Sequence, residues 1–169
     1  EFPIPTDSGR GNFVCKKDGD YWILFNKSNG TKIRLTFVDN APPYGKAKTP
    51  ELVDVKITDY CPHGCPTCSQ NSTTEGKHAK LGDIEYYLQD MEVFEVAIGG
   101  GEPTLHPKFA SILRGFEYCG IVPNFTSHNI EWAHNPEKLD AVKKHVGKFA
   151  ITVKDRVEAQ HAIYVANTF

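Results

Sequence analysis

The feature that most constrains the fold of this chain is a regular alternation of strand-like and helix-like segments that begins at Leu52. Short runs rich in β-branched and aromatic residues predict four strands, at Leu52–Thr58, Phe94–Ile98, Ile121–Thr126 and Phe149–Val153. Apolar residues recur at helical spacing after each strand, in four sets: Ile84, Tyr87, Leu88 and Met91; Phe109, Ile112, Leu113 and Phe116; Leu139, Val142 and Val146; and the run Val157–Val165. This alternation predicts an α/β fold with a parallel sheet or a segment of a (β/α) barrel.

Local signals predict where some of these elements begin and end. Asp83 is placed to cap the first helix, and Asn135 followed by Pro136 is a cap and first-turn signal for the third helix. Gly120 is suited to end the second helix in a left-handed conformation. Pro123 has no backbone N–H to donate, so we expect the third strand to be an edge strand or to be irregular.

The first forty residues follow a different pattern. Three segments are rich in aromatic and β-branched residues, Phe13–Lys17, Asp20–Asn26 and Thr31–Phe37. They are separated by Asp18-Gly19 and Asn29-Gly30, dipeptides that supply the positive φ angles of tight hairpin turns. The pattern predicts a three-stranded antiparallel β-ribbon, which must pack on another part of the chain because so small a sheet is marginal alone.

The segment Asn40–Pro50 contains three prolines and a glycine and is expected to be an irregular connection. We therefore expect a ribbon and connection over residues 1–50 and an α/β core over residues 51–169. From Leu52 onward the chain has room for just under four of the roughly 31-residue units of a (β/α) barrel. The core is thus expected to be incomplete at its C-terminal side.

Composition narrows the class of protein further. With 169 residues, 40% of them hydrophobic, the chain can bury a core, which excludes global disorder. A net charge of −2 gives no support to a nucleic-acid surface or to electrostatic membrane docking. No apolar run approaches the roughly 20 residues of a membrane span, and no secretory signal is visible. Five cysteines, an odd number, argue against a disulfide framework, so we expect a cytoplasmic protein. The sequence does not determine its oligomeric state.

Three cysteines, Cys61, Cys65 and Cys68, follow the first core strand with the spacing C-x3-C-x2-C. Three thiolates so close together suit a soft metal ion or an iron–sulfur cluster. One alternative is a structural zinc site with His63 or His78 as the fourth ligand. Otherwise we expect His63 to be a solvent-facing spacer, the other possibility being that it tunes the cluster. Structural zinc sites usually draw on two separated pairs of ligands, and this sequence offers no second pair. Three ligands to a four-iron cluster would leave one iron open to another ligand.

A second motif, Ala97-Ile98-Gly99-Gly100-Gly101-Glu102-Pro103, ends the second core strand. Glycines allow a ligand to approach the backbone, and a glutamate can accept hydrogen bonds from a cationic amino group. The alternative is an ordinary glycine-rich turn with a solvent-facing glutamate. The polar stretch Ser69–Lys80 also leaves two possibilities open, a cover over the site or a mobile surface loop.

Together the two motifs resemble those of the radical S-adenosylmethionine (radical SAM) superfamily over about residues 52–154. The resemblance implies a partial (β/α)6-type barrel, with about four βα units visible here, and a [4Fe–4S] cluster whose unique iron is chelated by S-adenosylmethionine. It also implies a one-electron reductant such as flavodoxin or ferredoxin. Reduction would cleave S-adenosylmethionine to methionine and a 5′-deoxyadenosyl radical, which abstracts hydrogen from a substrate.

The resemblance assigns roles to individual residues. It makes Cys61, Cys65 and Cys68 the iron ligands, and it places the methionine amino group against Gly100, Gly101 and Glu102.

Weaker assignments come from the later strands. Thr126 and Ser127 resemble a polar segment at the end of the family's third strand, although His128 and Asn129 follow where Asn-Gly is more usual. Thr152 and Lys154 lie where related proteins present polar groups to the ribose and carboxylate. Thr67 stands where the family often has an aromatic residue.

The sequence therefore predicts a radical SAM enzyme whose substrate is a peptide, a nucleoside or a small metabolite. The alternative is a non-catalytic module that binds zinc or an iron–sulfur cluster.

Overall fold

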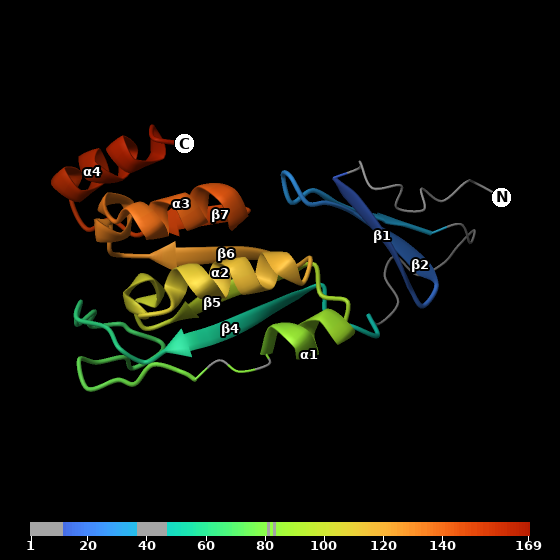
Figure 1. Ribbon diagram of the computed structural model, residues 1–169, viewed down its shortest axis with the longest axis horizontal. Helices are drawn as coiled ribbons and strands as arrows, with labels where there is room; N and C mark the ends of the chain where they lie inside the picture. The colour runs from blue at the N-terminus through green and yellow to red at the C-terminus, as the bar shows by residue number, and fades with distance from the viewer. Residues whose placement is uncertain (1–11, 37–46, 81, 83) are drawn as a thin grey trace.

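A computed structural model describes residues 12–36, 47–80, 82 and 84–169 of the chain. These residues form two sheets (Figure 1). The first is an antiparallel sheet of β1 (Phe13–Asp18), β2 (Tyr21–Asn26) and β3 (Lys32–Leu35), in that order. The second contains β4 (Leu52–Thr58), β5 (Glu95–Gly100), β6 (Val122–Ser127) and β7 (Lys148–Ile151), also in chain order and parallel throughout.

The helices alternate with the parallel strands as the sequence predicts. They are α1 (Ile84–Asp90), α2 (Phe109–Tyr118), α3 (Pro136–His145) and α4 (Arg156–Ala166), with short 3-10 turns η1 (Pro103–Leu105) and η2 (Glu131–His134). The fold is that of a partial (β/α) barrel preceded by a ribbon, and both parts of this prediction are confirmed. The described core contains four parallel strands, the number that the periodicity predicts.

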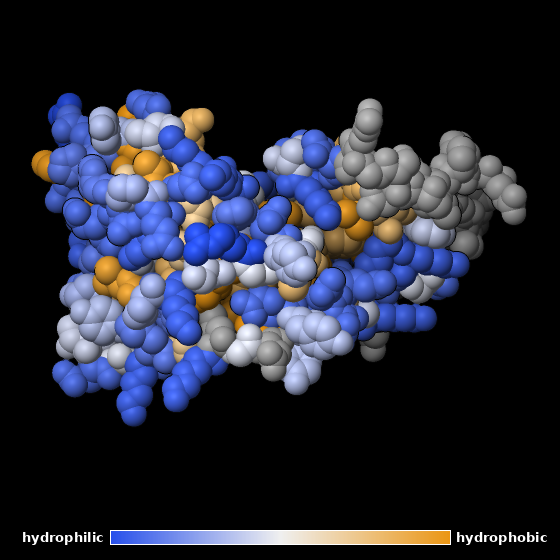
Figure 2. Space-filling view, in the orientation of Figure 1, coloured by the Kyte–Doolittle hydropathy of each residue, from blue (hydrophilic) through white to orange (hydrophobic). Residues whose placement is uncertain are grey.

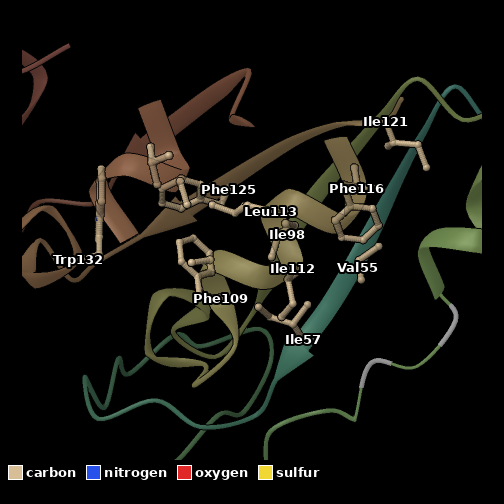
Figure 3. Packing of buried hydrophobic residues seen from close by; sticks show 14 of the residues in the cluster. Val55, Ile57, Ile98, Phe109, Ile112, Leu113, Phe116, Ile121, Phe125 and Trp132 are labelled. Atoms are coloured by element: carbon tan, nitrogen blue, oxygen red, sulfur yellow. The ribbon is translucent and has the colours of Figure 1, made fainter. Parts of the chain in front are cut away.

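The main core lies between the parallel sheet and its helices. Alternate residues of β4, β5 and β6 point toward the helices, and α2 meets them with four apolar side chains (Figure 3). The labelled members of this packing are Phe109, Ile112, Leu113 and Phe116 from α2, Val55, Ile57, Ile98 and Phe125 from the sheet, and Ile121 and Trp132 on either side of β6 in the sequence. The intervening residues face the other side of the sheet, where Asp54, Lys56 and Thr126 are exposed. On the face seen in Figure 2, hydrophilic side chains predominate and apolar ones form small separate patches.

Pro123 does not mark an edge strand, because β6 lies between β5 and β7. The backbone N–H of Val122 donates to Phe94 O, so the backbone of the next residue faces β7 instead. There the carbonyl of Pro123 accepts from Gly147 N, and pairing with β7 begins only at Asn124 and Lys148. The missing N–H of Pro123 therefore lies where the ladder has not yet begun, a position that tolerates proline.

The other boundary signals agree in part. Asn135 caps α3 by accepting from Lys138 N at 3.0 Å, and Gly120 has a positive φ of 76°. Helix α1 buries Leu88 but leaves Tyr87 63% exposed, so its apolar face is narrower than the spacing suggests.

Three sequence expectations fall wholly or partly outside the described residues. They are the cap at Asp83, the end of the third ribbon strand at Phe37, and residues 40–46 of the connection.

The ribbon packs on the amino ends of the parallel strands. Ile23 and Phe25 are fully buried, and the Phe25 ring stacks on Phe94, just before β5, with ring centroids 5.1 Å apart. Gly19 and Gly30 adopt positive φ angles in the two predicted turns. The ribbon thus buries its apolar face against the end of the core that lies away from the carboxyl ends of the strands (Figure 1).

Candidate functional site

The carboxyl ends of the parallel strands bring the predicted site segments to one edge of the sheet. β4 leads into the cysteine loop, β5 ends in the glycine segment, and β6 ends at Ser127. The residues after β7 include Thr152 and Lys154. In Figure 1 these strand ends lie at the left, on the side away from the ribbon. A parallel sheet gathers the loops that follow its strands at one edge, which is where such folds bind ligands.

Gly100 and Gly101 lie against the backbone at the end of β4. A Cβ on Gly101 would lie 2.7 Å from Tyr60 C and still closer to Tyr60 O, and one on Gly100 would collide with Thr58 O. Gly101 N donates to Thr58 O at 2.7 Å, and Glu102 N donates to Tyr60 O at 2.8 Å. Glycine is therefore required at both positions for the glycine segment to bond to the strand that leads into the cysteine loop.

Glu102 is almost fully buried, with 2% of its surface exposed, so the solvent-facing alternative is wrong. Its Oε1 accepts from Thr104 Oγ1 at 2.6 Å, from Thr104 N at 3.2 Å and from Ser127 Oγ at 2.7 Å. Its Oε2 accepts from His128 N at 2.8 Å. The carboxylate thus joins the ends of β5 and β6. Its Oε2 retains more capacity than Oε1 to accept further hydrogen bonds.

Two histidines lie over this carboxylate. The His63 ring of the cysteine loop stacks on the His128 ring, with centroids 4.3 Å apart, and His63 Nε2 lies 3.7 Å from Glu102 Oε2. His128 Nε2 contacts Glu158 Oε2 of α4 at 3.3 Å. Burial first, and then the neighbouring His128, hold the pKa of His63 below its ordinary value. His63 is therefore partly buried against Glu102 and His128 rather than a solvent-facing spacer.

Both rings carry a buried nitrogen without a hydrogen-bond partner among the described residues, His63 Nε2 and His128 Nδ1. Buried polar atoms in native proteins are nearly always bonded, and exceptions often mark the place of a ligand or an ion. His63 lies within the cysteine motif and His128 follows the predicted polar segment at Thr126 and Ser127, but nothing in the sequence predicts that these two rings stack, because they lie in different segments.

The three cysteines of the motif are free thiols in the loop after β4. Burial raises the pKa of the Cys61 thiol despite a hydrogen bond from the His63 backbone. The backbone N–H groups of Ser72 and Gln70 lower the pKa of the Cys68 thiol. Thiolates are the ligands of iron–sulfur clusters, so this donor set fits one. In the described ranges no three His, Cys, Asp or Glu residues are arranged to hold one metal ion, and this includes the three cysteines of the motif.

The polar stretch after the cysteines turns back along the outer edge of β4. Asp59 N donates to Lys77 O and Cys61 N donates to Thr73 O, both at 2.9 Å, and Ala79 N donates to Ile57 O at the same distance. Isolated bridges pair Thr58 with His78 and Tyr60 with Thr73. This part of the stretch is therefore ordered against the strand and supports the cysteine loop.

The later residues are only partly brought to the site. Ser127 is buried and bonds Glu102, whereas Thr126 is exposed and faces the other side of β6. Thr152 and Lys154 are exposed, and Lys154 contributes its backbone N–H to Glu158 Oε2 at 2.6 Å. Their side-chain roles stay predictions.

The arrangement is that of an α/β protein with a thiolate-rich loop and a buried carboxylate at the carboxyl edge of a parallel sheet. Residues 55–163 match the family described as the Radical SAM superfamily, and the chain belongs to that superfamily. Membership makes it one of a class of enzymes and implies a [4Fe–4S] cluster, S-adenosylmethionine and a reductant.

Parts of the chain are similar to one curated relative in sequence and to solved structures in fold. The chain is 27% identical over 94 residues to the PqqA peptide cyclase of Ruegeria pomeroyi, covering 52% of this chain and 24% of the cyclase. Its fold is similar to that of Streptococcus suis SuiB bound to S-adenosylmethionine, with a TM-score of 0.61, 15% identity, and coverage of 85% of this chain and 47% of SuiB. For SuiB bound to its precursor peptide SuiA the TM-score is 0.66 at 15% identity, with coverage of 93% and 52%. The chain thus spans about half the length of SuiB and about a quarter of the length of the cyclase.

Among the described residues, no helix is both long and apolar enough to span a membrane.

Proposed function

We propose that this chain holds a [4Fe–4S] cluster through Cys61, Cys65 and Cys68 and binds S-adenosylmethionine beside it. The bound group would supply one electron for reductive cleavage of the sulfonium, and the resulting 5′-deoxyadenosyl radical would take hydrogen from the substrate. The observation that carries the proposal is the backbone bond between Glu102 N and Tyr60 O, the residue before Cys61. It fixes the carboxylate segment next to the first cysteine.

The residues at this edge have separable tasks. Gly100 and Gly101 bring the backbone of the glycine segment close to β4, and Glu102 Oε2 offers an acceptor for the methionine ammonium. His63 and Ser127 surround the carboxylate and limit the access of water to it. Thr126, Thr152 and Lys154 remain candidates for contacts to the rest of S-adenosylmethionine.

For the substrate we propose a peptide. Support comes from the two relatives, one named as a peptide cyclase and the other solved with a precursor peptide. A nucleoside or a small metabolite has no corresponding support. Addition of a peptide substrate is expected to increase the formation of 5′-deoxyadenosine over the unstimulated rate.

The test of the cluster and its chemistry is anaerobic reconstitution with iron and sulfide, followed by dithionite reduction with S-adenosylmethionine. We expect about four irons per chain, a brown protein that bleaches in air, and 5′-deoxyadenosine as a product. C65A is expected to lose the absorbance and the product completely. C119A is the matched control, because Cys119 is also a free cysteine but lies at the end of α2. A colourless, zinc-loaded protein with an intact fold would support the non-catalytic alternative instead.

A further inference from the structure

Three glycines from two separate segments converge on one stretch of backbone, Thr58–Tyr60, at the end of β4. Gly100 and Gly101 approach it from β5 and belong to the motif already described. The third, Gly76, lies in the polar stretch after the cysteines and belongs to no motif. A methyl group at Gly76 would lie 2.5 Å from Tyr60 N and closer still to the carbonyl carbon and oxygen of Asp59.

The close approach is what requires glycine at this position. Gly76 is absent from the glycines with positive φ, so backbone strain does not demand it. The atoms that a Cβ would meet are backbone atoms, which cannot move aside as the end of a flexible side chain can. Gly101 reaches the same peptide unit, since its own Cβ would lie 3.0 Å from Asp59 C. The Asp59–Tyr60 peptide is therefore held between two glycines.

This peptide connects the two halves of the proposed cofactor site. Tyr60 O accepts from Glu102 N at 2.8 Å, and the residue after Tyr60 is Cys61. Asp59 N and Cys61 N, one on each side of Tyr60, donate to Lys77 and Thr73 in the segment that carries Gly76. Moving the peptide would change the position of the first cysteine relative to the glutamate.

We infer that Gly76 is a positioning residue of the cysteine loop, acting with Gly101 as a two-sided clamp on the Asp59–Tyr60 peptide. The inference rests on the proposed function, because the clamp matters only if Cys61 and Glu102 serve one bound cofactor. Displacements on the order of 1 Å in such sites reduce activity by up to about a hundredfold. A side chain at Gly76 is therefore expected to disturb cofactor binding although Gly76 touches no cofactor.

The first experiment compares G76A with G82A. Gly82 also lies between β4 and α1 and has no positive φ, and a Cβ there would meet no atom of the described residues within 4 Å, which makes it a matched control. After anaerobic reconstitution we expect G76A to retain less than half of the wild-type iron. The remaining cluster should bind S-adenosylmethionine about tenfold more weakly, a loss of about 1.4 kcal/mol. The electron paramagnetic resonance spectrum of the reduced cluster with S-adenosylmethionine should also change. G82A should match the wild type in all three measurements.

A purely structural role for Gly76 predicts a different result. G76A would then unfold at a lower denaturant concentration, but its folded fraction would show wild-type iron content, spectrum and affinity for S-adenosylmethionine. That outcome would overturn the inference.

The second experiment uses the protein without a cluster, so that it does not depend on the proposed function. Hydrogen exchange resolved to single amides is expected to be faster in G76A at Asp59, Cys61 and Glu102, and unchanged in G82A. Glu102 is decisive because it reports on the opposite side of the clamped peptide. Unchanged exchange at Glu102 in G76A overturns the clamp. If exchange at Glu102 is faster in G76A but the wild type never assembles a cluster, the clamp is sustained and the proposed function is refuted.

If G76A does not fold, the amide exchange rates of the wild type test the clamp instead. The amides of Asp59, Cys61 and Glu102 should then exchange at least tenfold more slowly than that of Asn71, which bonds only within the cysteine loop. Equal rates would show that no clamp exists.

Discussion

At the amino edge of the parallel sheet, buried charged groups of the ribbon and of β5 are bonded within the chain, whereas at the carboxyl edge two stacked imidazole rings each carry a buried nitrogen without a hydrogen-bond partner among the described residues. At the amino edge, Lys16 donates to Glu92 O at 3.1 Å, and Glu95 pairs with Lys32 at 2.7 Å. Asp18 accepts from Lys48 N at 2.9 Å. At the carboxyl edge, Glu102 accepts from His128 N, and its Oε2 lies 3.7 Å from Nε2 of the His63 ring, which stacks on His128.

The difference shows how one sheet supports both stability and ligand binding. The ribbon packs its apolar face and paired charges on the amino edge, although Asn124 Oδ1 and His145 Nδ1 are also buried there without a hydrogen-bond partner among the described residues. The carboxyl edge is built from loops that leave polar groups incompletely bonded, and such groups are costly to bury unless a ligand completes them. Substitutions at the two edges should therefore affect different measurements.

The largest effect is expected at Glu102. In E102A the buried Thr104, Ser127 and His128 donors lose their shared acceptor, so we expect a loss of at least about 3 kcal/mol in the free energy of unfolding. This loss would obscure any change in ligand affinity. E102Q keeps the shape and one oxygen but removes the charge, so it is the sharper variant.

For E102Q we expect a cluster content like that of the wild type and an affinity for S-adenosylmethionine lower by about tenfold to a hundredfold, since a charge-assisted hydrogen bond contributes about 1.5–3 kcal/mol. Calorimetry on the reconstituted protein measures the affinity for S-adenosylmethionine. Wild-type affinity in E102Q would reduce Glu102 to a structural link between β5 and β6 and would remove the functional side of the comparison.

A smaller effect, confined to stability, is expected at the amino edge. Lys16 is 6% exposed and caps the end of α1 through Met91 O and Glu92 O. K16M leaves both carbonyls without this donor, so urea unfolding should show a loss of about 1–3 kcal/mol. K17M serves as the control because Lys17 is the exposed neighbour.

The iron content and the affinity for S-adenosylmethionine of K16M should equal those of the wild type, measured on the folded protein. If K16M weakens S-adenosylmethionine binding while its stability is unchanged, the two edges are coupled and the comparison breaks down.

The elements of the core could be predicted because their signals are local. Alternation over Leu52–Thr58 and the cap at Asn135 depend on residues within a few positions of each other, and both agree with the structure. The prediction that Pro123 marks an edge strand was wrong because the tolerance for proline depends on where β7 begins, 25 residues later. Tyr87 shares the helical spacing of Leu88 but faces solvent, since the short helix α1 buries only part of its apolar side.

The candidate site could be predicted only as far as its motifs reach. The cysteines and the glycine segment are contiguous and recognisable, whereas the His63–His128 stack joins segments 65 residues apart. Gly76 stands alone in a polar stretch, and its close approach to Asp59 exists only once the chain turns back on β4. Pairings of this kind depend on tertiary structure and leave no local signature.

The smallest expected effect is a difference between the edges in their response to pH. At the carboxyl side, burial lowers the pKa of His106, whose ring accepts from Lys108 N at 3.0 Å and bonds Ala79 O at 3.1 Å. At the amino edge the pKa of Asp18 is also lowered, because backbone bonds from Lys48 and Thr49 outweigh the opposing effect of burial.

The two groups act in different pH ranges. Unfolded histidine takes up a proton as the pH falls below about 6.5, while folded His106 stays neutral to a lower pH, so unfolding is favoured as the pH falls. Asp18 contributes stability above about pH 3.9, its unfolded value, and loses it only in stronger acid. The carboxyl side should therefore weaken first on acidification.

Urea unfolding at pH 7.5 and pH 5.5 provides the measurement. The wild type is expected to lose more stability between these two values than H106N, whose side-chain oxygen can still accept from Lys108 N but does not titrate. D18N should show the same change as the wild type in this range and differ from it only near pH 3.5. An identical pH dependence in H106N and the wild type would show that His106 carries none of the response, and a flattened curve in D18N near neutrality would place the sensitivity at the amino edge instead.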